Sequence, residues 1–194
     1  MNRSIFTLAA AGTATLALAA CSQPDETTTA PTETAATTDM ATTDAAMTPA
    51  AADSHTAQFL TDAMKGDNSE VRVGKLAAEK GSTEGVRDYG NMLASDHGDH
   101  FTKLTDLANS MSVPIAEGTK KEADELYAKL QGLSGAAFDK AFVEGMVKDH
   151  QKDIDAYQQE ADSSDPAPVT TLAKNTVPTL KKHLETAQSL QSKM

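Results

Sequence analysis

Histidines at helical spacing are the residues of this chain that point most clearly to chemistry. Four of the five fall where apolar residues recur three and four positions apart, so helices would carry them on inward-facing stripes. They are His97, His100, His150 and His183. Burying a polar group without a partner costs about 1 to 3 kcal/mol, so each ring must bind another polar group or a metal ion. The fifth histidine, His55, lies at the expected domain edge and is predicted to be exposed and inert.

Two of these histidines sit in segments that resemble each other. The stretch that begins Asp96-His97 aligns with the stretch that begins Asp149-His150. Successive residues of a helix point about 100° apart. Asp96 and Asp149 are therefore better placed to hydrogen-bond a ligand, or to reach another helix, than to bind the same ion as the histidines.

Ligands that project inward from facing helices are the way in which helical bundles build metal sites. We expect His97 and His150 to be the first ligands, followed by His183 and by Glu70 from the first helix. Secondary or alternate ligands are His100, Asp153, Asp96, Asp149 and Met146. A thioether beside imidazole would suit copper, although methionine at such a position more often packs in the core. The alternative is a polar layer that fixes helix register without any metal.

The elements that must position these side chains are helices. Apolar spacing, glycines and prolines predict four long helices and one short helix. The first long helix is expected at about residues 56–80, and the second begins after a cap at Ser82 and ends near residue 111. The short helix begins with a capping box at Thr119–Glu122 and ends near residue 130. The third long helix begins after a cap at Ser134 and ends near residue 161, and the fourth begins at Asp165-Pro166 and ends near residue 190.

No strand pattern of useful length is apparent, so the expected fold class is all-α. The long connection between the second and third long helices allows them to run parallel, with the short helix inside the crossover. One long crossover is typical of the ferritin-like four-helix bundle. The expected domain spans residues 55–194.

The first 54 residues predict a targeting signal followed by a tether. Residues 1–20 combine a basic start with a short apolar core and end in small residues before Cys21, which resembles a bacterial lipoprotein signal. Cys21 would then be acylated, with palmitate among the candidate lipids, and Ser22 after it favours the outer membrane. The alternatives are an ordinary secretory signal with a chance cysteine, or a short membrane helix. The apolar stretch is shorter than the roughly 20 residues that a membrane span needs.

Residues 21–54 hold mostly Thr, Ala and Pro and, after Cys21, no Leu, Ile, Val or aromatic residue. Such a segment has no apolar surface to bury and is predicted to be a disordered tether. About half of the net negative charge of the mature chain lies there. The net charge of −11 argues against nucleic acid as a partner, and the single cysteine excludes an internal disulfide or a zinc finger.

Four groups of residues in the helical region together indicate a family. They are Glu70-Val-Arg-Val-Gly74, Val86-Arg87-Asp-Tyr-Gly90 with Asp96-His97, Gly135-Ala-Ala-Phe138-Asp139 with Asp149-His150, and Pro178-Thr-Leu180-Lys-Lys-His183. With them, residues 59–190 resemble the bacterial family called domain of unknown function 4142, which is grouped with ferritin-like folds and outer-membrane proteins. The resemblance implies the fold and an envelope location, and it implies no activity.

Compared with ferritins, the inner positions here carry histidine and Asp where those proteins carry Glu and Glu-x-x-His. A nitrogen-rich site favours zinc, copper or nickel over a di-iron centre. We therefore expect a lipid-anchored protein of the cell envelope, facing the periplasm, that binds a transition metal in metal handling or stress response. The alternative is a structural or interaction module without enzymatic activity. A catalytic role is the less favoured interpretation.

Overall fold

The computed structural model describes residues 51–194, and all of its regular structure is helical. The helices are α1 (Ser54–Lys80), α2 (Glu84–Ser110), α3 (Lys121–Gln131), α4 (Gly135–Ala161) and α5 (Ala167–Gln191). Within the described range there is no strand, and none of the helices is both long and apolar enough to cross a membrane. The expected signal peptide, Cys21 and nearly all of the expected tether lie outside the described residues.

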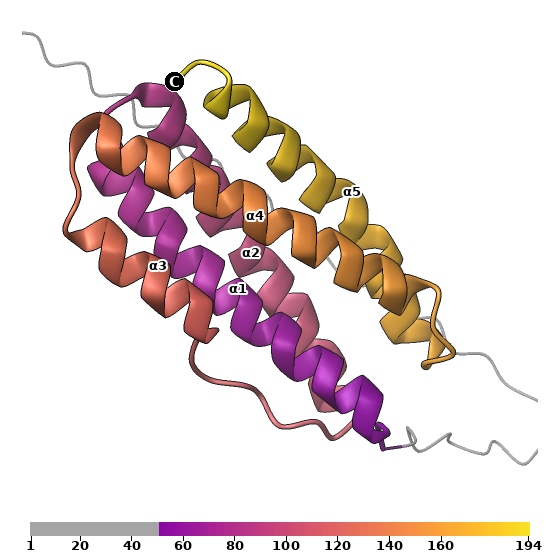
Figure 1. Ribbon diagram of the computed structural model, residues 1–194. Helices are drawn as coiled ribbons and strands as arrows, with labels where there is room; N and C mark the ends of the chain where they lie inside the picture. The colour runs from indigo at the N-terminus through magenta and orange to yellow at the C-terminus, as the bar shows by residue number, and fades with distance from the viewer. Residues whose placement is uncertain (1–50) are drawn as a thin grey trace, which may run out of the picture. The chain divides into compact units, whose positions relative to one another are not determined.

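The four long helices form two antiparallel pairs, α1 with α2 and α4 with α5 (Figure 1). Short turns join the helices of each pair. A long connection that includes α3 leads from the end of α2 back along α1, so that α2 and α4 run parallel (Figure 1). The expected four-helix bundle with a short helix in its crossover is therefore confirmed.

Helix α1 can lie close to α2 because glycines face each other across the contact. A Cβ atom on Gly74 would lie 2.7 Å from the carbonyl oxygen of Gly90, and one on Gly90 would lie 2.6 Å from that of Gly74. Any larger side chain would force the two backbones apart. This contact brings the inner face of α1 within reach of the histidines on α2.

Two of the expected helix caps are wrong, and a third, Ser134, is at the expected N-cap position without the expected hydrogen bond. Thr83, not Ser82, caps α2, because Ser82 is held by the Asp139 carboxylate through its backbone N–H at 2.8 Å and its hydroxyl at 2.7 Å. Ser134 precedes α4 without making a cap hydrogen bond. The Thr119–Glu122 capping box does not form.

At the start of α3 a tertiary contact replaces the expected capping box. The backbone N–H of Lys120 donates to the Ser69 hydroxyl of α1 at 2.9 Å. The Thr119 hydroxyl donates to Asp124 at 2.7 Å instead of capping the helix. Long-range bonds to α1 thus override the local sequence signal.

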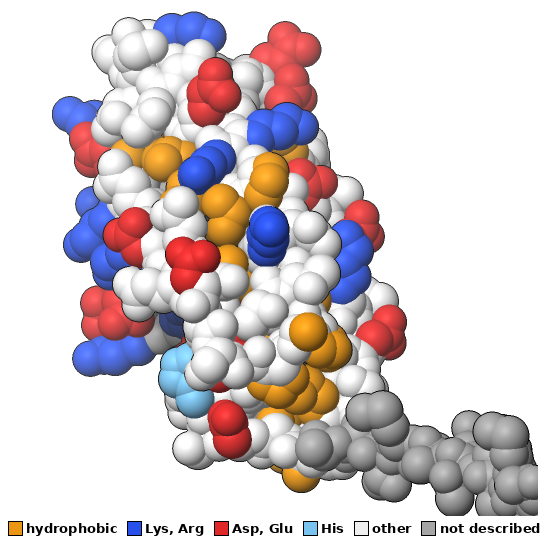
Figure 2. Space-filling view, turned by 90° about the vertical axis from the view of Figure 1, so that its right-hand side faces the viewer, with side chains coloured by type: hydrophobic (Ala, Val, Ile, Leu, Met, Phe, Trp, Pro, Cys, Tyr) orange, Lys and Arg blue, Asp and Glu red, His pale blue; other side chains and the backbone are white. Residues whose placement is uncertain are grey.

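The core consists of two apolar clusters with a polar layer between them. One cluster gathers Val86, Phe138, Phe142 and Met146 near the α1–α2 turn, and the other gathers Leu60, Leu104, Ile154 and Leu180 toward the opposite end. Buried polar side chains occupy the middle: Asp67, Glu70, His97, His150, Asp153 and His183. On the outside, charges of both signs alternate with small apolar groups on the face in Figure 2.

Candidate metal centre

Three histidines from three helices meet in the polar layer. His97 of α2, His150 of α4 and His183 of α5 each offer a nitrogen that lies within 4.8 Å of the other two. Their exposed fractions are 6%, 0% and 1%, so water competes little for these nitrogens. These are the three histidines that the sequence analysis placed first as ligands.

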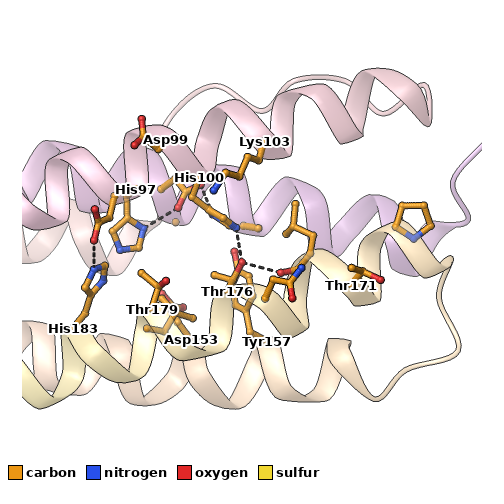
Figure 3. Close-up of a pocket in the computed structure, with 18 of the residues that line it drawn as sticks. His97, Asp99, His100, Lys103, Asp153, Tyr157, Thr171, Thr176, Thr179 and His183 are labelled. Atoms are coloured by element: carbon orange, nitrogen blue, oxygen red, sulfur yellow. Dashed lines mark hydrogen bonds and ion pairs between the residues drawn. The ribbon is translucent and has the colours of Figure 1, made fainter.

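The second nitrogen of each ring faces an oxygen atom. His97 Nδ1 lies 2.8 Å from Asp67 Oδ1, His183 Nε2 lies 2.9 Å from Asp96 Oδ2, and His150 Nδ1 lies 3.0 Å from the Met146 carbonyl oxygen. Figure 3 shows His97 and His183 with these interactions. Carboxylate and carbonyl oxygens only accept hydrogen bonds, so the three nitrogens must be the protonated ones.

The remaining nitrogens therefore carry lone pairs that converge. His150 Nε2 lies 3.3 Å from His183 Nδ1, and His97 Nε2 is buried without a hydrogen-bond partner among the described residues. Two nitrogens that each bind a tetrahedral zinc ion at about 2.0 to 2.1 Å lie roughly 3.3 to 3.4 Å apart. The separation of His150 from His183 thus matches that of two ligands on one ion.

Burial keeps His150 and His183 in the neutral form that binds metals. Desolvation, with His97 and His183 nearby, lowers the pKa of His150 to about 3. Desolvation also lowers the pKa of His183, against the opposing effect of the Asp96 carboxylate. Metal binding to these two rings would therefore not have to displace a proton at neutral pH.

Glu70 is not part of this group. It lies on the other side of His150, with Oε1 3.8 Å from Nδ1, and it shares a cluster with Asp149 and Asp153. The expected single ligand set of three histidines and Glu70 is thus divided into two. The sequence places Glu70 on the inner stripe correctly, but periodicity does not say which edge of the His150 ring it approaches.

The other alternate ligands are engaged elsewhere. His100 Nδ1 lies 2.8 Å from Asp67 Oδ2, and its Nε2 lies 3.0 Å from the Thr176 hydroxyl, so both of its nitrogens have partners. Met146 contributes its carbonyl oxygen to His150, while its side chain packs in an apolar cluster. Asp96 hydrogen-bonds a histidine, as its position beside His97 suggested. His55 is exposed and pairs with Asp165.

Sequence reasoning missed Asp67 and Lys120. Asp67 accepts hydrogen bonds from two histidine rings and so orients both, and it continues the stripe through Ala63, Glu70 and Gly74. That spacing could have revealed it. Lys120 lies in the crossover, where helical spacing gives no signal, and its Nζ donates to Asp153 Oδ1 at 3.0 Å.

A cavity of about 590 Å³ opens beside the histidines. His97 and His183 line it together with polar side chains of α2 and α5, among them Lys103, Thr176 and Thr179 (Figure 3). A small ligand or water could therefore reach an ion held by the three rings from this side.

Comparison with known proteins supports the fold and the family. The crystal structure of a DUF305 fragment from Deinococcus radiodurans is similar, with a TM-score of 0.67 and 15% sequence identity over 74% of this chain and 99% of that one. At this identity the likeness shows the fold alone. No curated protein matches the chain. The family model described as domain of unknown function, DUF4142, matches residues 40–190, so the chain belongs to that family.

Proposed function

We propose that this bundle binds one transition-metal ion through His97 Nε2, His150 Nε2 and His183 Nδ1. One observation carries the proposal: three buried lone pairs converge, while the second nitrogen of every ring donates to an oxygen. Such outer partners fix the tautomer and the orientation of ligating histidines. A layer that only fixed helix register would instead be expected to place a proton between His150 Nε2 and His183 Nδ1, whose separation of 3.3 Å would then be a hydrogen bond.

Zinc or copper suits this ligand set better than iron. All three donors are neutral imidazoles, whereas the di-iron bundles use carboxylates. Three protein ligands leave a fourth position, and the cavity lined by His97 and His183 lies where water or a small anion would complete the coordination. The proposed role is metal handling in the cell envelope, without a defined reaction.

The location is a second part of the proposal. The signal-like residues 1–20 and the small residues before Cys21 support a lipid-anchored protein that faces the periplasm from the outer membrane. Cells fed labelled palmitate should label the wild-type chain and not Cys21→Ala. Labelling that persists in the variant would refute the anchor at this residue.

The metal site is tested by zinc binding to the metal-depleted protein. At a free zinc concentration about 100 times Kd, a single site adds about 2.7 kcal/mol of stability, which appears as a rise in Tm. We expect this rise for wild type and for His55→Ala, the matched control at an exposed histidine, and none for His97→Ala. No rise in wild type, or an equal rise in all three, would refute the site and leave the structural module as the interpretation.

A further inference from the structure

A second group of ligand atoms, two of them from buried residues and one from the half-buried Asp149, includes Glu70 on the other side of His150. Glu70 of α1 and Asp149 and Asp153 of α4 each offer a carboxylate oxygen, and these oxygens lie within 4.8 Å of one another. Asp149 and Asp153 are one helical turn apart, so they project from the same side of α4 toward Glu70. The group contains no nitrogen donor.

Glu70 is the unusual member because its carboxylate has no partner. The residue is 1% exposed, and neither Oε1 nor Oε2 accepts a hydrogen bond from the described residues. Buried carboxylates are normally paired, hydrogen-bonded or bound to a metal. Among the described residues, His150 Nδ1 lies 3.8 Å from Glu70 Oε1, too far for a hydrogen bond, and it donates to the Met146 carbonyl oxygen instead.

One ammonium group faces the three carboxylates. Lys120 reaches in from the crossover and places its Nζ 3.0 Å from Asp153 Oδ1. It passes over Gly66, where a Cβ atom would lie 3.1 Å from Nζ. Asp153 therefore has a counter-charge, while Glu70 and Asp149 share none at hydrogen-bond distance.

The group has its own access from outside. A cavity of about 480 Å³ between α1, α3 and α4 is lined by Glu70 and Asp149, and along it lie three further glutamates and three lysines: Glu122, Glu125, Glu144, Lys129, Lys148 and Lys152. The cavity beside the three histidines is a different one, lined by residues of α2 and α5, and Lys120 and Asp153 also border it. A cation could thus approach Glu70 and Asp149 without passing the histidines.

We propose that Glu70, Asp149 and Asp153 form a second cation site, separate from the histidine site, for a divalent ion that prefers oxygen ligands, such as Mn²⁺. Carboxylate oxygens suit Mg²⁺, Ca²⁺ and Mn²⁺, whereas the imidazole set suits zinc or copper. The Lys120 ammonium competes with the incoming ion for Asp153. Two ions of different character would then occupy the two sides of His150.

The test is a Mn²⁺ titration of the whole protein, followed by electron paramagnetic resonance of the free ion, with zinc present to fill the histidine site. Even outer partners of metal ligands are worth about 10- to 100-fold in affinity, so the loss of the charge of a direct ligand in Glu70→Gln should weaken Mn²⁺ binding at least about tenfold. Lys120→Met should strengthen it several-fold, because the competing ammonium is gone. If Lys120 only stabilises the fold, Lys120→Met should weaken Mn²⁺ binding or leave it unchanged.

Controls separate this site from the histidine site. His183→Ala should keep wild-type Mn²⁺ affinity while losing zinc, and Glu70→Gln should keep zinc. Helical circular dichroism identifies a variant that does not fold, in which case Asp149→Asn replaces Glu70→Gln. Three outcomes would each overturn the proposal. The wild type binds no Mn²⁺ saturably, the folded Glu70 or Asp149 variant keeps wild-type Mn²⁺ affinity, or only His183→Ala loses Mn²⁺.

Discussion

The two sides of the His150 ring present different solutions to burying polar atoms. On the side of Nε2, three neutral rings converge, and the far nitrogen of each is hydrogen-bonded. On the side of Nδ1 lies Glu70, whose carboxylate is grouped with those of Asp149 and Asp153; Lys120 pairs with Asp153, and the oxygens of Glu70 have no hydrogen-bond partner among the described residues. Neutral donors can be held ready at little electrostatic cost, whereas charged donors need a counter-charge in place.

The largest expected effect separates the two sides directly. His97→Ala removes one of three ligands and should weaken zinc binding about 100-fold or more. It leaves the carboxylates untouched, because His97 contacts Asp67 and not Glu70. Competition with a chromophoric zinc chelator measures the first effect, and a Mn²⁺ titration should show no change. Equal losses for both ions would mean that the two sides form one site.

A smaller effect is expected from the residue that orients the rings. Asp67→Asn leaves His97 Nδ1 and His100 Nδ1 without a carboxylate acceptor and should lower zinc affinity about 10- to 100-fold. Asp99→Asn, an exposed residue at the same cavity, is the matched control and should bind zinc like wild type. If both variants bind zinc equally well, the orienting role of Asp67 is wrong.

The stability of the metal-free protein should show the same contrast between satisfied and unsatisfied carboxylates. Asp139 is as buried as Glu70, but it accepts hydrogen bonds from both Ser82 and Thr83. Asp139→Ala should cost about 1 to 3 kcal/mol of unfolding free energy. Glu70→Met should cost nothing or stabilise the protein, because burial and the nearby Asp149 carboxylate raise the pKa of Glu70 well above its usual value, and a carboxyl without a hydrogen-bond partner among the described residues gives way to an apolar group. Urea unfolding measures both, and a larger loss for Glu70→Met would reverse the comparison.

The pH dependence of stability gives the smallest effect. Burial raises the pKa of Asp139, but hydrogen bonds from Ser82 and Thr83 outweigh it and hold the pKa below its usual value. A carboxyl with a lowered folded-state pKa stabilises the fold above its unfolded pKa of about 3.9 and loses that contribution as pH falls through the folded pKa. Urea midpoints between pH 6 and pH 2 should therefore fall less steeply for Asp139→Asn than for wild type. Parallel curves would show that Asp139 does not titrate in this way.

Much of this arrangement follows from periodicity alone. Three- and four-residue spacing predicts the long helices to within a few residues, and it places Glu70, His97, His150 and His183 on inner faces. The same spacing also places Asp67 on the inner face of α1, between Ala63 and Glu70. Periodicity fixes the face of a helix and not the partner across it, so the division between Glu70 and the histidines required the structure.

Tertiary contacts explain what the sequence could not predict. Lys120 and Ser82 lie in connections whose conformation is set by bonds to Ser69 and Asp139, far away in the chain. Where a distant partner is better placed, the capping residue or the backbone N–H bonds to that partner, and the local cap does not form. Residues of this kind also bring the ammonium of Lys120 to the carboxylates.

X-ray absorption at the zinc edge tests the central claim most directly. We expect nitrogen or oxygen donors at about 2.0 to 2.1 Å. We also expect outer scattering from three imidazole rings in wild type, falling to two in His97→Ala. A spectrum without imidazole scattering, or one that is identical in wild type and His97→Ala, would contradict the three-histidine site.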